Sequence, residues 1–303
     1  MSKPLPTAWL NDHFLPLEQA HISPLDRGFL FGDAVYELIP VYAGQPFRLE
    51  EHLERLEYSL AETRIPNPMD RANWRQMLAE LVTRNGQGDQ AVYLQVSRGA
   101  DTGRDHRFPD PPPQPTCFAM ASPLPAMPDH IRERGACVQI HPDQRWQRCD
   151  IKATTLLANL LARQEAHEAG ADEALLERDG LLVEGSSTSF YLIRGNTLLT
   201  PPLDHRILPG ITRQVVLELA EEQGLSIRET ALRREDLEPA DECWISSSGR
   251  ELVPVTRIML SPEHHLTIGD GRPGPVWQVI AKQLHDLARG HTDPEPREAG
   301  INE

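Results

Sequence analysis

Long apolar runs are absent from this sequence of 303 residues, in which apolar residues make up 39%. This absence excludes a chain that crosses a membrane as a helix, because such a span needs about 20 consecutive apolar residues. The segment 1–14 has no basic stretch followed by an apolar one, so we expect no secretory signal and a cytoplasmic location. Positive charge is also in deficit, with a net charge of −15. This disfavours nucleic acid as a partner, because its binders usually carry a basic face.

Cysteine and histidine are too few and too scattered to predict a metal centre. The four cysteines contain no C-x-x-C pair, and their spacing matches neither a zinc site nor a disulfide framework. Among the twelve histidines only His264 and His265 are adjacent, and they lie in a polar stretch. We therefore expect no bound metal, and free buried thiols in a reducing compartment.

Lysine is the scarcest charged residue, because only Lys3, Lys152 and Lys282 stand among the 30 basic residues. Most lysines are surface residues, and Lys152 could be one of them. Its neighbours suggest partial burial instead, because Ile151 precedes it and an apolar, helix-like segment follows. The positive potential at a helix N-terminus and the loss of solvent would both favour a neutral amine. A neutral amine can form a Schiff base, and arginine cannot.

The first half of the chain combines strand and helix patterns. Strand patterns cover 7–16 (a hairpin), 34–42, 90–99 and 116–122. Helix patterns cover 48–60 and 73–86. In the first helix, one face carries Leu49, Leu53, Leu56 and Leu60. The proline-rich segment 100–115 between the last two strands is a long loop, and such loops tend to be functional or disordered.

The second half begins after a linker, which we place at 122–128. Strand patterns cover 136–142, several short segments within 173–200, and 241–248. Helix patterns cover 154–169, 211–224 and 275–288. We expect Leu156, Leu157, Leu160 and Leu161 to form the packed face of the first of these helices. The fold class is then α+β with two domains, 1–121 and 129–290, followed by a polar tail, 291–303, that we expect to be disordered.

Four short polar motifs could carry chemistry, and each also has an ordinary structural interpretation. Glu184 and the following Gly-Ser-Ser end a strand, which is also typical of a simple turn. Ile211 and Thr212 open a helix whose free N–H groups could bind phosphate, although Thr212 could also be a cap. Three serines, 246–248, end another strand. Arg55 lies away from the leucine face of its helix, so the helical period alone predicts that it is solvated.

Taken together and in this order, several motifs resemble the fold-type-IV pyridoxal-phosphate enzymes. The motifs are HLERL, DIKATTLLANLLARQEAHEAGADEALL, VEGSSTSFYLI, LPGITRQVV and ISSSGRELVPV. This family includes the D-amino-acid and branched-chain aminotransferases and aminodeoxychorismate lyase. The resemblance extends over residues 10–258. It implies a small N-terminal α/β domain, a larger C-terminal pseudo-barrel domain, and pyridoxal 5′-phosphate as cofactor.

The resemblance also implies a role for each matching residue. Lys152 would form the Schiff base with the cofactor and move the proton between the substrate Cα and the cofactor C4′. Glu184 would face the pyridine nitrogen and keep it protonated, so that the ring accepts electrons. Arg55 would bind the phosphate, against the prediction from the helical period. The remaining contacts would come from Leu208 at the ring and from Ile211, Thr212, Ser247 and Ser248 at the phosphate.

The segment SRGADTGRDHRFP resembles the loop of the D-amino-acid aminotransferases that carries an Arg-x-His pair. The resemblance implies that Arg104 and His106 reach across a homodimer interface and bind the substrate α-carboxylate, which a guanidinium can grip with two hydrogen bonds. Taken alone, this segment could be a solvated basic loop. Tyr36 resembles the tyrosine of the same carboxylate site, although it could be a buried strand residue. Leu38 would face the same side and line the pocket.

One departure from the family pattern concerns specificity. Gly249-Arg250 stand where small hydroxyl residues are typical of the D-amino-acid enzymes, and Arg250 could be a surface residue or could add positive charge to the pocket. We expect a dimeric enzyme that transfers an amino group between a D-amino acid, such as D-alanine or D-glutamate, and 2-oxoglutarate or pyruvate. The alternatives on this scaffold are a branched-chain L-amino-acid or R-amine transaminase and aminodeoxychorismate lyase. A carrier of the cofactor without catalysis would not need an electron sink.

Overall fold

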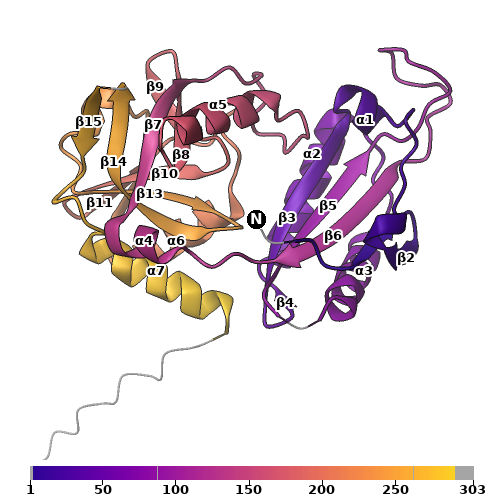
Figure 1. The fold of residues 1–303 in the computed structure, drawn as a ribbon, viewed down its shortest axis with the longest axis horizontal. Coiled ribbons are helices and arrows are strands. Elements are labelled where there is room, and N and C mark those ends of the chain that lie inside the picture. The colour runs from indigo at the N-terminus through magenta and orange to yellow at the C-terminus, as the bar shows by residue number, and fades with distance from the viewer. Residues whose placement is uncertain (1–2, 87, 262, 291–303) are drawn as a thin grey trace, which may run out of the picture.

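The computed structural model describes residues 3–86, 88–261 and 263–290, which form two sheets with separate cores (Figure 1). The first sheet is antiparallel, with the strand order β2-β1-β6-β5-β3-β4. Its strands are β1 (Thr7–Leu10), β2 (His13–Pro16), β3 (Ala34–Tyr42), β4 (Gln45–Pro46), β5 (Gln90–Ser97) and β6 (Thr116–Pro123). Its helices are η1 (Leu17–Gln19), α1 (Arg27–Phe31), α2 (Leu49–Thr63) and α3 (Arg71–Arg84).

The leucine face predicted for α2 is confirmed. Leu53, Leu56 and Leu60 are buried in the core of the first sheet, and Leu49 packs against it. The predicted hairpin is also present, because β1 and β2 pair across a turn in which Asn11 and Asp12 have φ angles of 44° and 70°. Asparagine and aspartate tolerate this left-handed conformation better than most residues.

The second sheet has nine strands in the order β12-β11-β10-β13-β14-β7-β8-β9, and β15 pairs with β14. Its strands are β7 (Ala136–Pro142), β8 (Glu173–Arg178), β9 (Leu181–Gly185), β10 (Ser189–Arg194), β11 (Thr197–Thr200), β12 (Ser226–Glu229), β13 (Glu242–Ser247), β14 (Glu251–Ser261) and β15 (His264–Thr267). Its helices are α4 (Asp129–Arg134), α5 (Leu157–Glu168), α6 (Ile211–Glu222), η2 (Arg234–Asp236) and α7 (Pro275–Ala288). Figure 1 shows α5 and α7 on opposite sides of this sheet.

The prediction for α5 was wrong in two respects. The helix begins at Leu157 rather than Thr154, because the preceding residues pair with the first sheet: Thr154 donates its N–H to the carbonyl of Ala34 at 3.0 Å. The expected packed leucines are largely exposed, Leu157 by 70% and Leu160 by 61%. The side of α5 that packs on the second sheet carries small residues, such as Ala162, which allow a close approach. The leucines therefore face away from the body of the chain.

The two sheets are connected twice along the chain. β6 ends at Pro123 and α4 begins at Asp129, so the expected linker 122–128 overlaps the end of a strand. Farther on, Ile151 and Ala153 return to the first sheet and form part of its core, although β7 precedes them. The expected division into two domains remains a prediction, and the tail 291–303 lies outside the described residues. In the part of the chain that the structure describes, no helix has the length and apolar character needed to cross a membrane.

Candidate active site

Lys152 lies in the segment that returns to the first sheet. Its carbonyl accepts a hydrogen bond from the N–H of Tyr36 at 2.9 Å, and Val35 forms a bridge with Ala153. The backbone is therefore fixed on both sides of the lysine. The amine points at the neighbouring strand, because Nζ lies 4.4 Å from the centroid of the Tyr36 ring. The structure thus brings two of the predicted site residues into contact.

The wall behind this amine is formed by β3 and β5. Tyr36 stacks on Tyr93, with ring centroids 5.6 Å apart. Burial raises the pKa of Tyr93 to about 12, so its phenol stays neutral at physiological pH. Leu38 is half-buried and, two residues after Tyr36, lies on the same face of β3. The predicted positions of Tyr36 and Leu38 on one side of the pocket are thereby compatible with the structure.

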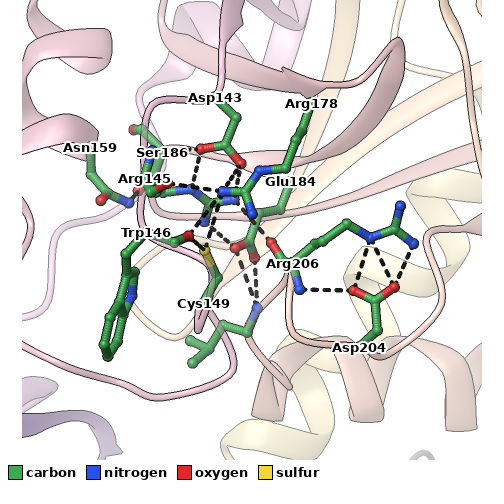
Figure 2. A network of polar contacts seen from close by, with 11 residues as sticks. Asp143, Arg145, Trp146, Cys149, Asn159, Arg178, Glu184, Ser186, Asp204 and Arg206 are labelled. Atoms are coloured by element: carbon green, nitrogen blue, oxygen red, sulfur yellow. Dashed lines mark hydrogen bonds and ion pairs between the residues drawn. The ribbon is translucent and has the colours of Figure 1, made fainter.

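Glu184 is buried at the end of β9 and is held by two groups, the Arg145 guanidinium and the Leu208 N–H (Figure 2). Arg145 forms a short ion pair with its Oε1. The N–H of Leu208 donates to Oε2 at 3.1 Å, which places the expected ring contact beside the carboxylate. Arg145 is itself fixed by Asp143, whose Oδ1 accepts from Nε at 2.9 Å. Arg178 binds the other oxygen of Asp143 at 2.8 Å.

The protonation of Glu184 depends on competing effects. Burial raises the pKa of its carboxyl above the usual value, and the Arg145 guanidinium and the Leu208 N–H limit that rise. A pyridinium nitrogen beside this carboxyl would add a further positive charge and favour the ionised form. Sequence reasoning missed Arg145 and Asp143, because in the sequence they are ordinary polar residues after a strand.

Arg55 is buried, so the prediction from the helical period was wrong. Its Nε and one Nη donate to the two oxygens of Glu37, each at 2.8 Å, and His52 contacts the same carboxylate at 2.7 Å. Burial would raise the pKa of Glu37, but Arg55 and then His52 hold it well below its usual range. The other Nη of Arg55 donates to the carbonyl of Pro209 at 2.8 Å. Arg55 therefore lies beside the segment that opens α6. Glu37 is the one charged residue in the apolar strand 34–42, and this pattern could have indicated a buried carboxylate with a charged partner.

The N-terminus of α6 is built to leave backbone donors free. Gly210 is the N-cap residue and supplies no side-chain cap, so the alternative that Thr212 caps the helix is wrong. Ile211 and Thr212 form the buried first turn. A Cβ on Gly210 would lie 2.8 Å from Oγ of Ser189, so glycine allows the close packing here. Arg55 and this helix end together provide the charge and N–H groups that an anion requires.

Ser247 and Ser248 lie at the turn between β13 and β14. Both are half-buried, and neither hydroxyl has a hydrogen-bond partner among the described residues. The next residue, Gly249, faces the pocket wall: a Cβ built on it would lie 3.6 Å from Cδ2 of Leu38. The turn therefore adjoins the same wall that carries Tyr36.

Arg104 and His106 are not brought to Lys152 within one chain. Both are exposed, and both contact Phe31 of α1: Arg104 Cζ lies 4.8 Å from the ring centroid and the His106 ring 5.3 Å. Arg27 supports the loop by donating to the carbonyl of Asp105 at 2.7 Å. Figure 1 shows the loop after β5 projecting beyond α1, on the far side from the second sheet. In the single chain the Arg-x-His pair is therefore exposed and packs on α1.

A model of the family described as amino-transferase class IV matches residues 34–258. The chain belongs to this family, whose members use pyridoxal 5′-phosphate for transamination and share the fold-type-IV α+β architecture. The residues fit this cofactor, because an amine, a buried carboxylate, and an arginine beside an open helix end suit its aldehyde, ring nitrogen and phosphate. Pyridoxal 5′-phosphate is therefore the cofactor of this aminotransferase.

Among curated relatives, the chain is similar to D-alanine aminotransferases. It is 38% identical over 282 residues to that of Bacillus licheniformis, covering 93% of this chain and 97% of the relative. It is 32% identical over 284 residues to that of Staphylococcus epidermidis, covering 94% and 98%. Among solved structures, the branched-chain amino acid aminotransferase of Escherichia coli has a TM-score of 0.87 at 26% identity, covering 96% of this chain and 97% of that one. The branched-chain aminotransferase of Thermoproteus uzoniensis with norvaline has a TM-score of 0.81 at 26% identity, with the same coverage of 96% and 97%.

Proposed function

We propose that this aminotransferase transfers the amino group of a D-amino acid, such as D-alanine or D-glutamate, to 2-oxoglutarate or pyruvate. The observation that carries the proposal is the contact between the Lys152 amine and the Tyr36 ring, at 4.4 Å from its centroid, in a chain that also has the outward Arg-x-His loop. The similarity to D-alanine aminotransferases over 93% of the chain supports it. Donor and acceptor would use this site in turn, which is a ping-pong mechanism.

In this proposal each group of residues holds one part of the cofactor. Lys152 takes the aldehyde end, Glu184 the ring nitrogen, and Leu208 packs at the ring. Arg55, Ile211, Thr212, Ser247 and Ser248 take the phosphate. When bound, pyridoxal phosphate supplies an electron sink for the charge left on the substrate Cα. Glu184 favours the protonated ring nitrogen, and Arg145 fixes the orientation of Glu184.

The proton step requires a base that changes its role within one cycle. The Lys152 amine, once free, would take the proton from the substrate Cα and later deliver it to the cofactor C4′, on the other side of the amino nitrogen. The hydrogen bond from Tyr36 to the Lys152 carbonyl and the burial of Ala153 keep the backbone still, so the long side chain alone has to move. Tyr36 and Tyr93 form an aromatic wall beside the amine.

The proposal assigns the substrate α-carboxylate to Tyr36 of one chain and to Arg104 and His106 of a second copy. Two observations support such a homodimer. Arg104 and His106 are exposed and contact Phe31 of α1, and apolar side chains are exposed nearby: Phe29 on α1 by 75% and Leu157 on α5 by 70%. The ends of these helices are connected through their flanking residues, because Thr154, three residues before α5, donates its hydroxyl to the carbonyl of Gly32, the C-cap of α1, at 3.1 Å. Exposed apolar patches often mark interfaces.

A branched-chain L-amino-acid aminotransferase is the second candidate, since solved structures with that name share this fold at TM-scores of 0.87 and 0.81. The Arg-x-His loop favours the D-amino-acid reaction. We also propose a cytoplasmic location, supported by four free, buried cysteines, which suit a reducing compartment.

The experiment that tests the function gives the purified holoenzyme D-alanine or L-leucine, each with 2-oxoglutarate. We expect turnover with D-alanine, a shift of the visible absorbance of the cofactor with D-alanine alone, and loss of both in Lys152→Ala. The loss should be at least about 1,000-fold, because no other amine of the described residues lies against Tyr36. Turnover of L-leucine alone would reassign the chain to the branched-chain group, and pyruvate release from aminodeoxychorismate without an acceptor would make it a lyase.

A further inference from the structure

Arg250 is a charged residue beside the wall that carries Tyr36 and Leu38. It follows Gly249 in the turn between β13 and β14, and the Cβ position of Gly249 is 3.6 Å from Leu38. Gly249 is outside the left-handed region, and an added Cβ would meet nothing closer, so neither the backbone nor packing requires glycine there. The lack of a side chain leaves space between the pocket wall and the guanidinium that follows.

The guanidinium of Arg250 is anchored on a buried carboxylate. Glu173, fully buried in β8, accepts from Nη1 of Arg250 at 3.2 Å and from the hydroxyl of Ser187 at 3.3 Å through Oε2. Its other oxygen accepts from Ser186 and from the N–H of Ala174. Ser186 and Ser187 follow Glu184 by two and three residues. The anchor therefore ties Arg250 to the turn that closes the cofactor site.

The positive charge at this anchor exceeds the negative charge of Glu173. Arg163 of α5 lies 3.3 Å from the other oxygen of Glu173, so two guanidiniums share one carboxylate. Asp172, the next acid, accepts from a backbone N–H at 2.9 Å and faces a third arginine, Arg257. Burial lowers the pKa of the Arg250 guanidinium, Glu173 opposes this, and the repulsion from Arg163 adds to it. An incoming anion would relieve that repulsion.

Arg250 also has donors to spare. A guanidinium carries five N–H groups, and Glu173 is the one hydrogen-bond acceptor of the Arg250 guanidinium among the described residues. Arg55 is more fully engaged, because three of its five N–H groups bind two oxygens of Glu37 and one carbonyl. The Arg250 side chain is 37% exposed, so a ligand in the pocket can reach it. Arg250 is therefore fixed in place but open toward a second carboxylate.

We infer that Arg250 is a specificity-determining residue that binds the side-chain carboxylate of a dicarboxylic substrate, such as D-glutamate, D-aspartate or the matching 2-oxo acid. Glu173 is a positioning residue that holds Arg250, and Arg163 adds positive charge behind it. This inference rests on the proposed function, because it concerns the far end of the same substrate. The α-carboxylate would stay with Tyr36 and the Arg-x-His loop.

The test compares D-glutamate with D-glutamine, which has the same shape without the charge. The measured quantity is the ratio of their kcat/KM values in the holoenzyme, for the wild type, Arg250→Ser and Arg250→Lys. We expect the ratio to fall about 10- to 100-fold in Arg250→Ser, because hydrogen bonds between charged groups contribute that much. Arg250→Lys keeps the charge but loses the planar pair of N–H donors, so its ratio should lie between those of the wild type and Arg250→Ser.

The matched control is Arg194→Ser, an arginine that is also paired with a carboxylate, Asp236, and is 42% exposed. Because Ile193 lies opposite Glu242, Arg194 is at the other end of β13 from the Arg250 turn, on the order of 20 Å away, so the ratio should be unchanged. An equal loss for D-glutamate and D-glutamine in Arg250→Ser would overturn the inference, as would weaker cofactor binding with an unchanged ratio. If the wild type turns over D-alanine but the ratio never moves, the inference alone fails. If it turns over no D-amino acid, the proposed function fails.

Discussion

At the scale of single residues, Arg55, the arginine expected at the phosphate, depends on Glu37, which is more deeply buried than Arg55 itself. Glu37 is fully buried, and Arg55 and His52 neutralise and orient it. A buried ion pair whose members are all hydrogen-bonded is tolerated, whereas removal of one partner leaves an uncompensated charge. The position of Arg55, and hence its use for an anion, depends on this carboxylate.

Glu37→Gln should therefore destabilise the protein by about 3–5 kcal/mol at pH 7, because it leaves the Arg55 charge buried without a counter-ion. The low pKa of Glu37 in the folded state means that its stabilisation is complete above the unfolded value of 4.5 and is lost as the pH falls below it. The difference between wild type and variant should shrink from pH 5 downward. Urea unfolding at pH 7.5, 5.5 and 4 measures both effects.

A suitable control for this experiment is Glu54→Gln on the exposed side of the same helix, which should leave the unfolding free energy and its pH dependence unchanged. A wild-type-like free energy of unfolding for Glu37→Gln at pH 7 would contradict the buried pair.

Sequence motifs singled out the residues that we propose to hold the cofactor, but not the residues that support them. Lys152, Glu184 and Arg55 stand out by their motifs, and the structure places each of them where that assignment is feasible. Arg145 and Glu37 do not, because their partners are 39 and 18 residues away along the chain. A helical period describes one helix alone, so it cannot show that a strand places a carboxylate beside Arg55.

At the scale of elements, α7 begins on a cap supplied by another element. Glu242 of β13 is buried and accepts from the N–H groups of Val276 at 2.8 Å and Trp277 at 2.9 Å, and from the indole of Trp244 at 2.9 Å. The N-cap residue, Gly274, offers no side chain and leaves room for the carboxylate, because a Cβ there would lie 2.0 Å from its carbon. The start of α7 is thereby fixed to the second sheet.

Glu242→Ala should lower the free energy of unfolding by about 2–4 kcal/mol, because three N–H donors, two of them buried, lose their acceptor. The expected result is a lower melting temperature with kinetic constants of the remaining folded enzyme unchanged, since the cap lies away from Lys152. Glu238→Ala, an exposed acid nearby in sequence, should melt like the wild type. Equal melting temperatures for Glu242→Ala and Glu238→Ala would rule out the cap.

The helices could be predicted from the sequence better than their orientation. The pattern at 154–169 identified α5, but not which side of it packs on the sheet, because leucines at an interface and leucines in a core have the same periodicity. Its first residues deviate from the prediction because the edge of β3 takes their backbone hydrogen bonds.

At the scale of the whole molecule, the exposed leucines of α5 should be covered by a second copy. Leu160→Asp with Leu161→Asp places two charges among side chains that are 61% and 50% exposed in the single chain. We expect the wild type to sediment as a dimer and the double variant as a monomer. D-Alanine turnover should fall by at least about 100-fold, because Arg104 and His106 would no longer reach a partner's substrate.

The control is Leu287→Asp on α7, a leucine that is 44% exposed on a different helix, which should remain dimeric and active. A double variant that sediments like the wild type would place the interface elsewhere. A monomer with full activity would show that the Arg-x-His pair is not needed from a second copy.

Residues 151–153 return to the core of the first sheet. The residues that we propose to bind the cofactor are therefore divided between the two sheets. Lys152 and Arg55 lie against the first sheet, whereas Glu184 and the N-terminus of α6 belong to the second. A cofactor bound by all four groups would link the two sheets, which the chain itself connects only by short segments. Binding of the cofactor would then fix the distance between the two sheets, and its loss would make their relative position more variable.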